Sequence, residues 1–399
     1  MVRQYCLMKT DWLRCIGVCL LVWVSRADAA SDPDVDRGLG LSVGPDGQLY
    51  RGSTVYRGVG VNYYDLFVRQ LLDDTNRTAI GGLEALAQHR IPFVRFAAGG
   101  YWPRDWGLYQ TNRSEYFARL DNVVQSAERL RIGLIPSLFW HYSAVPDLVR
   151  EPVGAWGDTN SLTVRWMREY TRQVVLRYRG SRAIWAWEFG NEYNLPADLP
   201  NASEHRPPIV PDLGTPAQRS AADDFTHQML RSALMQFGLE VRHHDRNRLI
   251  VSGNAFPRPS AWHQIAANTW QADTPAQFGE VLAADNPSPV NSLCVRAYEV
   301  VSDLGRLSLA MKVSREIRKP LFVGEFGVPG ELDDTSRRLF SSMLQSLETN
   351  QVPLAALWVY DFGAQAKDWN VTFKNARSWQ LEQIMLVNDR IASSVRRRQ

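Results

Sequence analysis

The sequence is short of cysteine and of long apolar runs. Only four of its 399 residues are cysteine, and three of them, Cys6, Cys15 and Cys19, fall in the first twenty positions. The fourth, Cys294, has no second thiol to pair with in the rest of the chain. With 27 Gly and 21 Pro, the chain is not collagen-like, and 45% hydrophobic residues are too many for wholesale disorder.

The N-terminus carries a pattern typical of a signal peptide. Arg3, Lys9 and Arg14 precede an apolar run at 15–24, and Ala27 and Ala29 form a small-x-small cleavage site. The run is shorter than the roughly 20 residues of a spanning helix, so an uncleaved anchor is the less favoured alternative. We therefore expect residues 1–29 to be a signal peptide and 30–399 a single catalytic domain. An export signal without disulfides fits a periplasmic or secreted protein with no membrane association after cleavage.

Excess charge of one sign is also missing. The leader carries four basic and two acidic residues, so its removal lowers the formal net charge from +3 to +1. A nearly neutral chain gives no reason to expect nucleic acid as a partner. We expect a monomer.

Several motifs of other enzyme classes are absent. The sequence contains neither a GxxxxGK phosphate loop nor a GxGxxG after its first strand, and it lacks HExxH and any Cys/His set with ligand spacing. Its one GxSxG match, at 40–44, precedes the first predicted barrel strand and does not stand at a predicted strand-to-helix turn. Nucleotide, metal and serine-hydrolase chemistry therefore have little support, and we expect neither a cofactor nor a metal.

Short apolar runs alternate with amphipathic segments along the chain. Eight runs are predicted as strands, at 55–62, 93–96, 133–139, 184–189, 248–252, 292–295, 321–323 and 355–358. Helical periodicity is clearest at 78–89, 116–130, 162–178, 221–241 and 335–349. Eight βα units in a chain of this length predict an α/β protein with a (β/α)8 TIM barrel. Pro45-Asp46-Gly47 predicts a short N-terminal β-hairpin, and 194–216 and 256–289 are predicted as enlarged βα loops.

Two glutamates stand at the ends of predicted barrel strands, where catalytic residues of such barrels lie. Glu192 follows the fourth strand in the sequence WEFGNE, and Glu325 follows the seventh in VGEFG. Strands four and seven are three apart around the ring, so both side chains can face one mouth. A facing carboxylate pair is what glycoside hydrolysis requires, because one group protonates the leaving oxygen while the other attacks the anomeric carbon or activates water.

These motifs resemble those of the cellulase-like glycoside hydrolases of family 5, within the clan of retaining (β/α)8 glycosidases. The resemblance extends over most of the chain after the leader and implies that Glu325 is the nucleophile and Glu192 the acid/base. It also implies that Arg95 on the second strand is the charge partner of Glu325, and that Asn191 binds the sugar 2-hydroxyl. Each has a structural alternative, an ion pair for Arg95 and a loop cap for Asn191.

The sixth strand departs from the family pattern. The family has His-x-Tyr there, whereas this chain reads Arg296-Ala297-Tyr298. The resemblance implies that Tyr298 hydrogen-bonds the nucleophile. Arg296 is either a substrate contact, which would favour an anionic sugar, or an additional structural cation. His141, after the third strand, either donates to a sugar hydroxyl or the acid/base, or is a structural residue.

Aromatic residues gather after the predicted strands, and the chain has 14 Trp. Flat rings stack on pyranose faces, although core packing accounts for about half of them. Trp358, at the end of the eighth strand, is predicted to lie under the reacting sugar, and Tyr101 and Trp102 to form a wall. Trp185 and Trp187 lie within a strand and are predicted to be core.

Together these observations predict a retaining glycoside hydrolase that cleaves β-linked hexose polysaccharides or oligosaccharides by double displacement, with β-mannan or β-glucan favoured. Two alternatives remain: a transglycosylase that uses the same intermediate, and a carbohydrate-binding barrel without catalysis.

Overall fold

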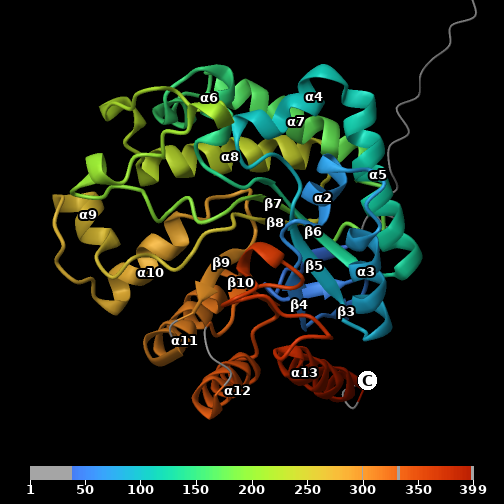
Figure 1. Cartoon of the computed structure of the whole chain (residues 1–399). Coiled ribbons are helices and arrows are strands. Elements are labelled where there is room, and N and C mark those ends of the chain that lie inside the picture. Colours follow the sequence, from blue (N-terminus) through green and yellow to red (C-terminus); the bar gives the residue numbers. More distant parts are fainter. Residues whose placement is uncertain (1–37, 299, 330–332, 397–399) are drawn as a thin grey trace, which may run out of the picture.

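The computed structural model describes residues 38–298, 300–329 and 333–396 (Figure 1). The predicted signal peptide, residues 1–29, lies outside the described residues. None of the described helices is long and apolar enough to cross a membrane.

Eight parallel strands form the centre of the molecule. Their bounds are β4 (Gly58–Asn62), β5 (Phe93–Ala97), β6 (Gly133–Phe139), β7 (Ala186–Gly190), β8 (Leu249–Val251), β9 (Leu293–Ala297), β10 (Leu321–Phe326) and β11 (Leu354–Leu357). The hydrogen-bonded order is β8-β7-β6-β5-β4-β11-β10-β9, which confirms the (β/α)8 prediction. Every residue of these strands is buried.

The seam between β8 and β9 is joined by side chains. Ile250 on β8 donates its amide to Asn291 Oδ1 at 2.8 Å, and Ser292 Oγ donates to the Ile250 carbonyl at 2.8 Å. These two bonds satisfy the Ile250 backbone and bring the first and last strands of the order together, so the sheet is nearly closed.

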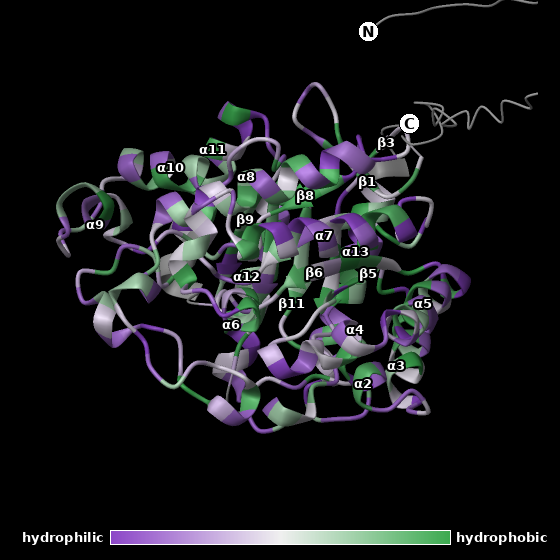
Figure 2. Cartoon of the chain, turned by 90° about the horizontal axis from the view of Figure 1, so that it is seen from above, coloured by the Kyte–Doolittle hydropathy of each residue, from purple (hydrophilic) through white to green (hydrophobic). Residues whose placement is uncertain are grey.

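The helices surround this sheet (Figure 1). They are α2 (Leu66–Leu72), α3 (Thr78–Gln88), α4 (Gly107–Thr111), α5 (Arg113–Leu130), α6 (Ala144–Val149), α7 (Leu162–Tyr178), α8 (His227–His244), α9 (Ala261–Ala267), α10 (Pro275–Ala284), α11 (Val300–Ile317), α12 (Asp334–Thr349) and α13 (Ser378–Arg396). In Figure 2 the central strands are mostly green, whereas the surrounding helices carry many purple residues.

Helix starts follow side-chain caps. Asn112, Ser161, Thr226 and Thr274 each accept a hydrogen bond from the backbone of the first turn. The predicted helix at 221–241 begins too early, because Ser220 caps a separate short turn at Ala221–Asp223 and Thr226 then caps α8.

The predicted N-terminal hairpin precedes the barrel, and a third strand extends it to a three-stranded antiparallel sheet that includes Val55, which was predicted to begin the first barrel strand. It contains β1 (Leu41–Val43), β2 (Leu49–Arg51) and β3 (Thr54–Val55). Leu41 and Leu49 pack into an apolar cluster with Phe93, Trp185 and other residues near the starts of the barrel strands. The hairpin therefore closes the amino-terminal end of the barrel, opposite the strand ends that carry chemistry.

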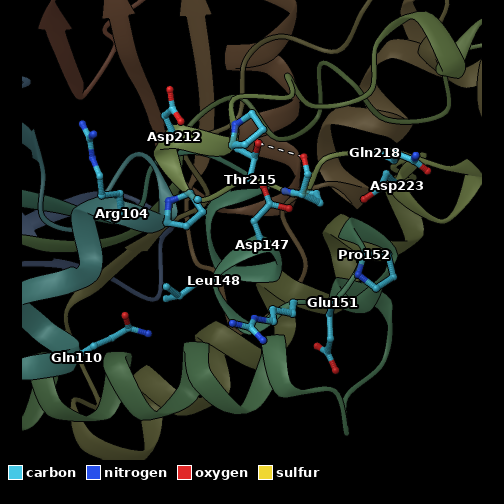
Figure 3. Close-up of a pocket in the computed structure, with 15 residues that line it drawn as sticks. Arg104, Gln110, Asp147, Leu148, Glu151, Pro152, Asp212, Thr215, Gln218 and Asp223 are labelled. Carbon is cyan, nitrogen blue, oxygen red and sulfur yellow. Dashed lines mark hydrogen bonds between the residues drawn. The ribbon is translucent and has the colours of Figure 1, made fainter.

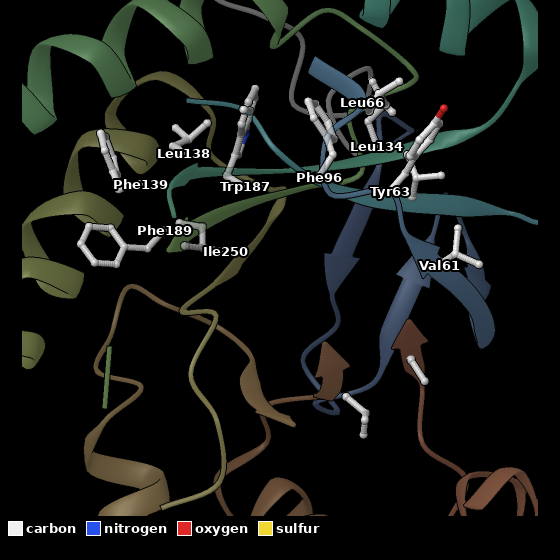
Figure 4. Close-up of a cluster of buried hydrophobic side chains, with 14 of the residues drawn as sticks. Val61, Tyr63, Leu66, Phe96, Leu134, Leu138, Phe139, Trp187, Phe189 and Ile250 are labelled. Atoms are coloured by element: carbon white, nitrogen blue, oxygen red, sulfur yellow. The ribbon is translucent and has the colours of Figure 1, made fainter. Parts of the chain in front are cut away.

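Strand alternation separates two sets of side chains, and Figure 4 shows members of the larger set, among them Trp187 and Phe189. On β7, Trp187 and Phe189 belong to the large cluster between strands and helices, whereas Ala186 belongs to the cluster inside the barrel. Glu188, two residues further on, is therefore also directed inward. Trp185 and Trp187 are 1% and 0% exposed, which confirms both as core residues.

The loops predicted to be enlarged are irregular segments with short helices. The loop at 194–216 contains 3-10 turns at Ala202–Glu204 and Pro211–Leu213, and the one at 256–289 folds into α9 and α10.

Replacing Trp185 tests the closure of the barrel floor. Its indole packs against Phe93 and Tyr56, with ring centroids at 5.7 and 5.2 Å, and Arg51 lies 4.3 Å above its ring. We expect Trp185→Ala to lower the free energy of unfolding in urea by about 3–5 kcal/mol, because a cavity replaces the indole. Trp270→Ala removes an indole that is 56% exposed and serves as the control. Equal losses in the two variants would contradict this account of the barrel floor.

Candidate active site

Arg95 on β5 lies at the centre of a buried polar layer near the carboxyl ends of the barrel strands. Its guanidinium contacts Glu188 Oε1, with Nη2 at 2.6 Å and Nε at 2.7 Å, and Glu325 Oε1, with Nη1 at 2.8 Å. The same Nη1 donates to Asn62 Oδ1 at 2.9 Å. Arg95 and Glu188 are 0% exposed, so each ion compensates the other's lost hydration.

Glu325, on β10, has donors on both carboxylate oxygens. Besides Arg95, the Nε of Arg296 lies 3.3 Å from Oε1, and the Tyr298 hydroxyl donates to Oε2. Burial, and then the charge of Glu325, raise the pKa of Tyr298 far above its ordinary value, so the phenol keeps the proton that it donates. Two hydrogen-bond donors, Arg95 and Tyr298, thus orient the carboxylate, and the charge of Arg296 lies beside it.

Asn191 is oriented by two guanidinium groups. Its Oδ1 accepts from Arg95 Nη2 at 2.8 Å and from Arg296 Nη2 at 3.0 Å. Because the carbonyl oxygen of the amide is thus engaged, the NH2 group is left to act as a donor. This is the polarity needed to bind the oxygen of a hydroxyl group.

Arg296 is buried and faces acceptors of the barrel. Its Nη2 also donates to the Gly253 carbonyl at 2.8 Å, and its Nη1 to Cys294 Sγ at 3.1 Å and the Val295 carbonyl at 3.3 Å. Burial opposes its charge, but Cys294 and Glu325 raise the pKa of Arg296 above its ordinary value. These contacts favour a role for Arg296 as an additional structural cation over a direct contact with an anionic sugar.

Glu192 sits just after β7 with a different environment. It is half-buried, and burial together with the negative charge of Glu325 raises its pKa to about 7, although Arg296 and Arg95 act in the opposite sense. A carboxyl group with a pKa near neutrality can both give and take a proton at physiological pH. Glu192 and Glu325 are therefore suited to different tasks.

A cavity of about 350 Å³ adjoins Glu192. Tyr101, His141 and Asn191 line it together with Glu192, and so do Trp140, Tyr142, Leu195, Pro196, Leu199 and His205. Burial, and then the charge of Arg219, lower the pKa of His141 to about 4, so the imidazole is neutral at pH 7. It is held against Tyr101, with ring centroids 4.9 Å apart.

Aromatic rings extend this wall. The ring centroids of Trp102 and His141 lie 5.7 Å apart. The ring of Tyr64 packs against both Trp140 and Trp358, with centroid distances of 4.8 and 6.1 Å. Trp358 is half-buried at the end of β11, and its indole donates to Gln365 at 2.8 Å. The rings supply flat apolar faces at the carboxyl end of the barrel.

Glu188 and Asn62 belong to the same layer but were not among the residues predicted from sequence. Asn62 Nδ2 donates to the Gly324 carbonyl at 2.9 Å, which ties β4 to the strand that carries Glu325. Both positions could have been found from strand alternation, because Glu188 lies two residues after an inward Ala186 and Asn62 lies two after Gly60.

Within the described parts of the chain, no group of three or more His, Cys, Asp or Glu side chains is placed to hold a metal ion.

Comparisons with solved structures identify the same architecture in sugar-cleaving enzymes. An endo-1,4-β-mannanase from Rhizomucor miehei superposes with a TM-score of 0.64 over 89% of this chain and 99% of its own, at 14% identity. A glycoside hydrolase family 5 mannosidase from the same organism gives 0.64 over 90% and 99%, at 10% identity. The chain has the fold of the family 5 glycoside hydrolases. The resemblance seen in the strand-end motifs is thereby confirmed at the level of the fold.

Sequence comparison alone reaches less far. No family model matches the chain. Mannan endo-1,4-β-mannosidase A of Hypocrea jecorina is 39% identical over 79 residues, which span 18% of each protein. The match thus covers less than a fifth of the length of that relative, and whole-protein activity does not follow from it.

The coupling between the two strand-end carboxyl groups can be measured directly. In Glu325→Gln the neighbouring negative charge is gone, so we expect the pKa of Glu192 to fall from about 7 toward its ordinary value. In Arg296→Gln a positive charge is lost, so the pKa of Glu192 should rise. Carbon NMR titration of the labelled glutamate carboxyl groups reads both shifts.

Glu84→Gln, on the exposed side of α3, is the control and should leave the Glu192 titration unchanged. Shifts of the same sign in Glu325→Gln and Arg296→Gln would show that charge does not set this pKa.

Proposed function

We propose that this chain is a retaining glycoside hydrolase of family 5 that cleaves β-linked hexose polysaccharides or oligosaccharides, with β-mannan favoured. The observation that carries the proposal is the pair of unlike carboxyl groups at one mouth of the barrel. Burial and the charge of Glu325 raise the pKa of Glu192 to about 7, whereas Glu325 accepts hydrogen bonds from Arg95 and Tyr298 beside the charge of Arg296. The mannan-active enzymes of the same fold support the choice of sugar.

In the first step, Glu325 attacks the anomeric carbon while the bond to the leaving oxygen breaks. Glu192 delivers its proton to that oxygen, so the leaving group departs as an alcohol and a glycosyl ester forms on Glu325. The Asn191 NH2 group donates to the sugar 2-hydroxyl, and the donors on Glu325 hold its carboxylate ready for attack.

In the second step, Glu192 takes a proton from water, and the resulting oxygen attacks the anomeric carbon. The ester bond to Glu325 breaks, the sugar leaves with its original configuration, and Glu192 is again protonated. Once Glu325 is esterified, its negative charge no longer opposes ionisation of Glu192, so the same group becomes a base at the right moment.

We further propose that cleavage of the signal peptide releases residues 30–399 as a monomeric catalytic domain to the periplasm or the medium. The apolar run and the small-x-small site of the leader support this assignment.

Turnover by carboxamide variants tests the two roles. Glu325→Gln should reduce reducing-sugar release from β-mannan by on the order of 10³-fold or more while oligosaccharide binding is kept, because the nucleophile is lost but the cavity stays. Glu192→Gln should cost about 10²–10⁴-fold on β-mannan. The loss should be much smaller on an aryl glycoside whose leaving group needs no proton.

Glu84→Gln is the matched control on the surface and should retain full activity. Sugar transfer to an added alcohol in place of water would indicate a transglycosylase. Binding without turnover in the unmodified protein would indicate a carbohydrate-binding barrel and contradict the proposal.

A further inference from the structure

The backbone of Glu192 has a conformation that is rare for a residue with a β-carbon. Its φ is +55°, in the left-handed region that glycine adopts readily and other residues seldom adopt. Such a conformation persists only where the surrounding structure holds it. The contacts around Glu192 therefore decide where its side chain points.

The carboxyl group of Glu192 does not fix its own direction. Glu325 accepts hydrogen bonds from Arg95 and Tyr298. Among the residues that the structure describes, by contrast, none donates a hydrogen bond to the carboxyl oxygens of Glu192. The aim of this carboxyl group thus depends on how the backbone of Glu192 and its neighbours is held.

On one side, the neighbours of Glu192 are tied to the end of β6. The amide of Asn191 donates to the Trp140 carbonyl at 3.2 Å. Tyr193 is 1% exposed, and its hydroxyl donates to the Phe139 carbonyl at 2.7 Å. These bonds anchor the residues before and after Glu192, but they leave its own amide to be satisfied elsewhere.

On the other side, the amide of Glu192 is tied to the segment that follows β8. It donates to the Gly253 carbonyl at 2.9 Å. Gly253 has a φ of +79°, and a β-carbon at this position would lie 1.8 Å from the Gly190 carbonyl oxygen. Only glycine therefore allows the two segments to approach so closely.

The side chain of Asn194 closes this contact. Its Oδ1 accepts from the Ala255 amide at 2.9 Å, and its Nδ2 donates to the carbonyls of Ala255 at 3.0 Å and Phe256 at 3.3 Å. Asn194 is 2% exposed. It supplies the donor and the acceptor that a neighbouring strand would supply, where neither segment forms a strand. Without its amide, these buried backbone groups would lose their partner, which is costly.

The outer part of the loop after β7 is built differently. Residues 211–218 line a separate cavity of about 870 Å³, and Figure 3 shows Asp212, Thr215 and Gln218 around it. Asp212 and Gln218 are exposed. The buried contact made by Asn194 is thus at the inner end of the loop, beside Glu192.

We propose that Asn194 is a positioning residue for proton transfer by Glu192. By holding 190–194 against 252–256, it keeps Glu192 in the left-handed conformation from which the carboxyl group reaches the leaving oxygen. The inference rests on the proposed function and adds a buried residue that acts through Glu192. The step itself is the one described above: the proton passes from Glu192 to the leaving oxygen, which keeps the electron pair of the broken bond, while Glu325 forms the ester.

Two aryl β-mannobiosides test this role. Dinitrophenolate leaves without a proton, whereas phenolate needs one from Glu192, and kcat/KM reports both reactions up to formation of the ester. In Asn194→Ala we expect kcat/KM for the phenyl glycoside to fall about tenfold to a hundredfold, because a misplaced acid transfers its proton poorly. The value for the dinitrophenyl glycoside should stay within about twofold, because that reaction does not use the acid.

Asn388→Ala is the matched control. Asn388, on α13, holds the backbone of Val59 in the same way, with Oδ1 accepting from the amide at 2.9 Å and Nδ2 donating to the carbonyl at 2.8 Å. Val59 lies near the start of β4, far along the strand from the active-site layer. This variant should lower the stability of the fold but leave the ratio of the two kcat/KM values unchanged. The ratio is also independent of the fraction of protein that folds.

An unchanged ratio in Asn194→Ala would overturn the inference while the proposed function stands, and so would an equal change in Asn388→Ala. Should Asn194→Ala fail to fold, Asn194→Asp decides by the same ratio, because it keeps an acceptor for the Ala255 amide but loses the amide donor. If the unmodified protein turns over no β-linked glycoside, the proposed function fails, and the inference falls with it.

Discussion

The buried guanidinium of Arg95 is the contact on which the active-site layer depends. It joins Glu188 of β7 to Glu325 of β10 and also reaches Asn62 and Asn191, so four segments of the barrel meet at one side chain. Removing one partner would leave the other groups charged and buried without compensation. The resulting loss of folding stability is far larger than that from breaking an exposed ion pair. Such a shared centre is possible because alternate side chains of each barrel strand point into the barrel.

This centre also explains why similar carboxyl groups have dissimilar environments. Glu188 lies wholly inside the barrel against Arg95, and Glu325 sits between two guanidinium groups and a phenol. Glu192 is placed beyond the strand, in a half-buried position beside a cavity, where burial and the charge of Glu325 raise its pKa to about 7. Position along β7 and its loop thus separates a fully buried carboxylate paired with Arg95 from a carboxyl group whose pKa is raised to about 7.

Much of the fold and part of the candidate site were predictable from sequence, because local residue patterns indicate where strands end. The eight apolar runs, the hairpin at Pro45-Asp46-Gly47 and both strand-end glutamates required only periodicity and motif spacing. Glu188 was not predicted, because the end of WEFGNE marks the end of the strand, whereas the role of its second residue follows from which side chains of β7 face inward.

Other features depend on contacts that a single sequence does not express. The direction of Arg296 follows from acceptors on three different segments, at Asn191, Gly253 and Cys294. The side-chain seam at Ile250 and the cavity beside Glu192 likewise require the folded barrel. Capping at Thr226 similarly overrode the longer helix that periodicity predicted for α8.

The central claim is that Glu325 forms a covalent bond to the sugar during turnover. The most direct measurement is mass spectrometry of the protein after reaction with the 2-deoxy-2-fluoro glycosyl fluoride of the hexose that it turns over, because that reagent slows release of the intermediate. The account predicts one adduct, on the peptide that contains Glu325. An adduct on Glu188 or Glu192 would contradict the account. Turnover of the reagent with no adduct and no loss of activity would also contradict it.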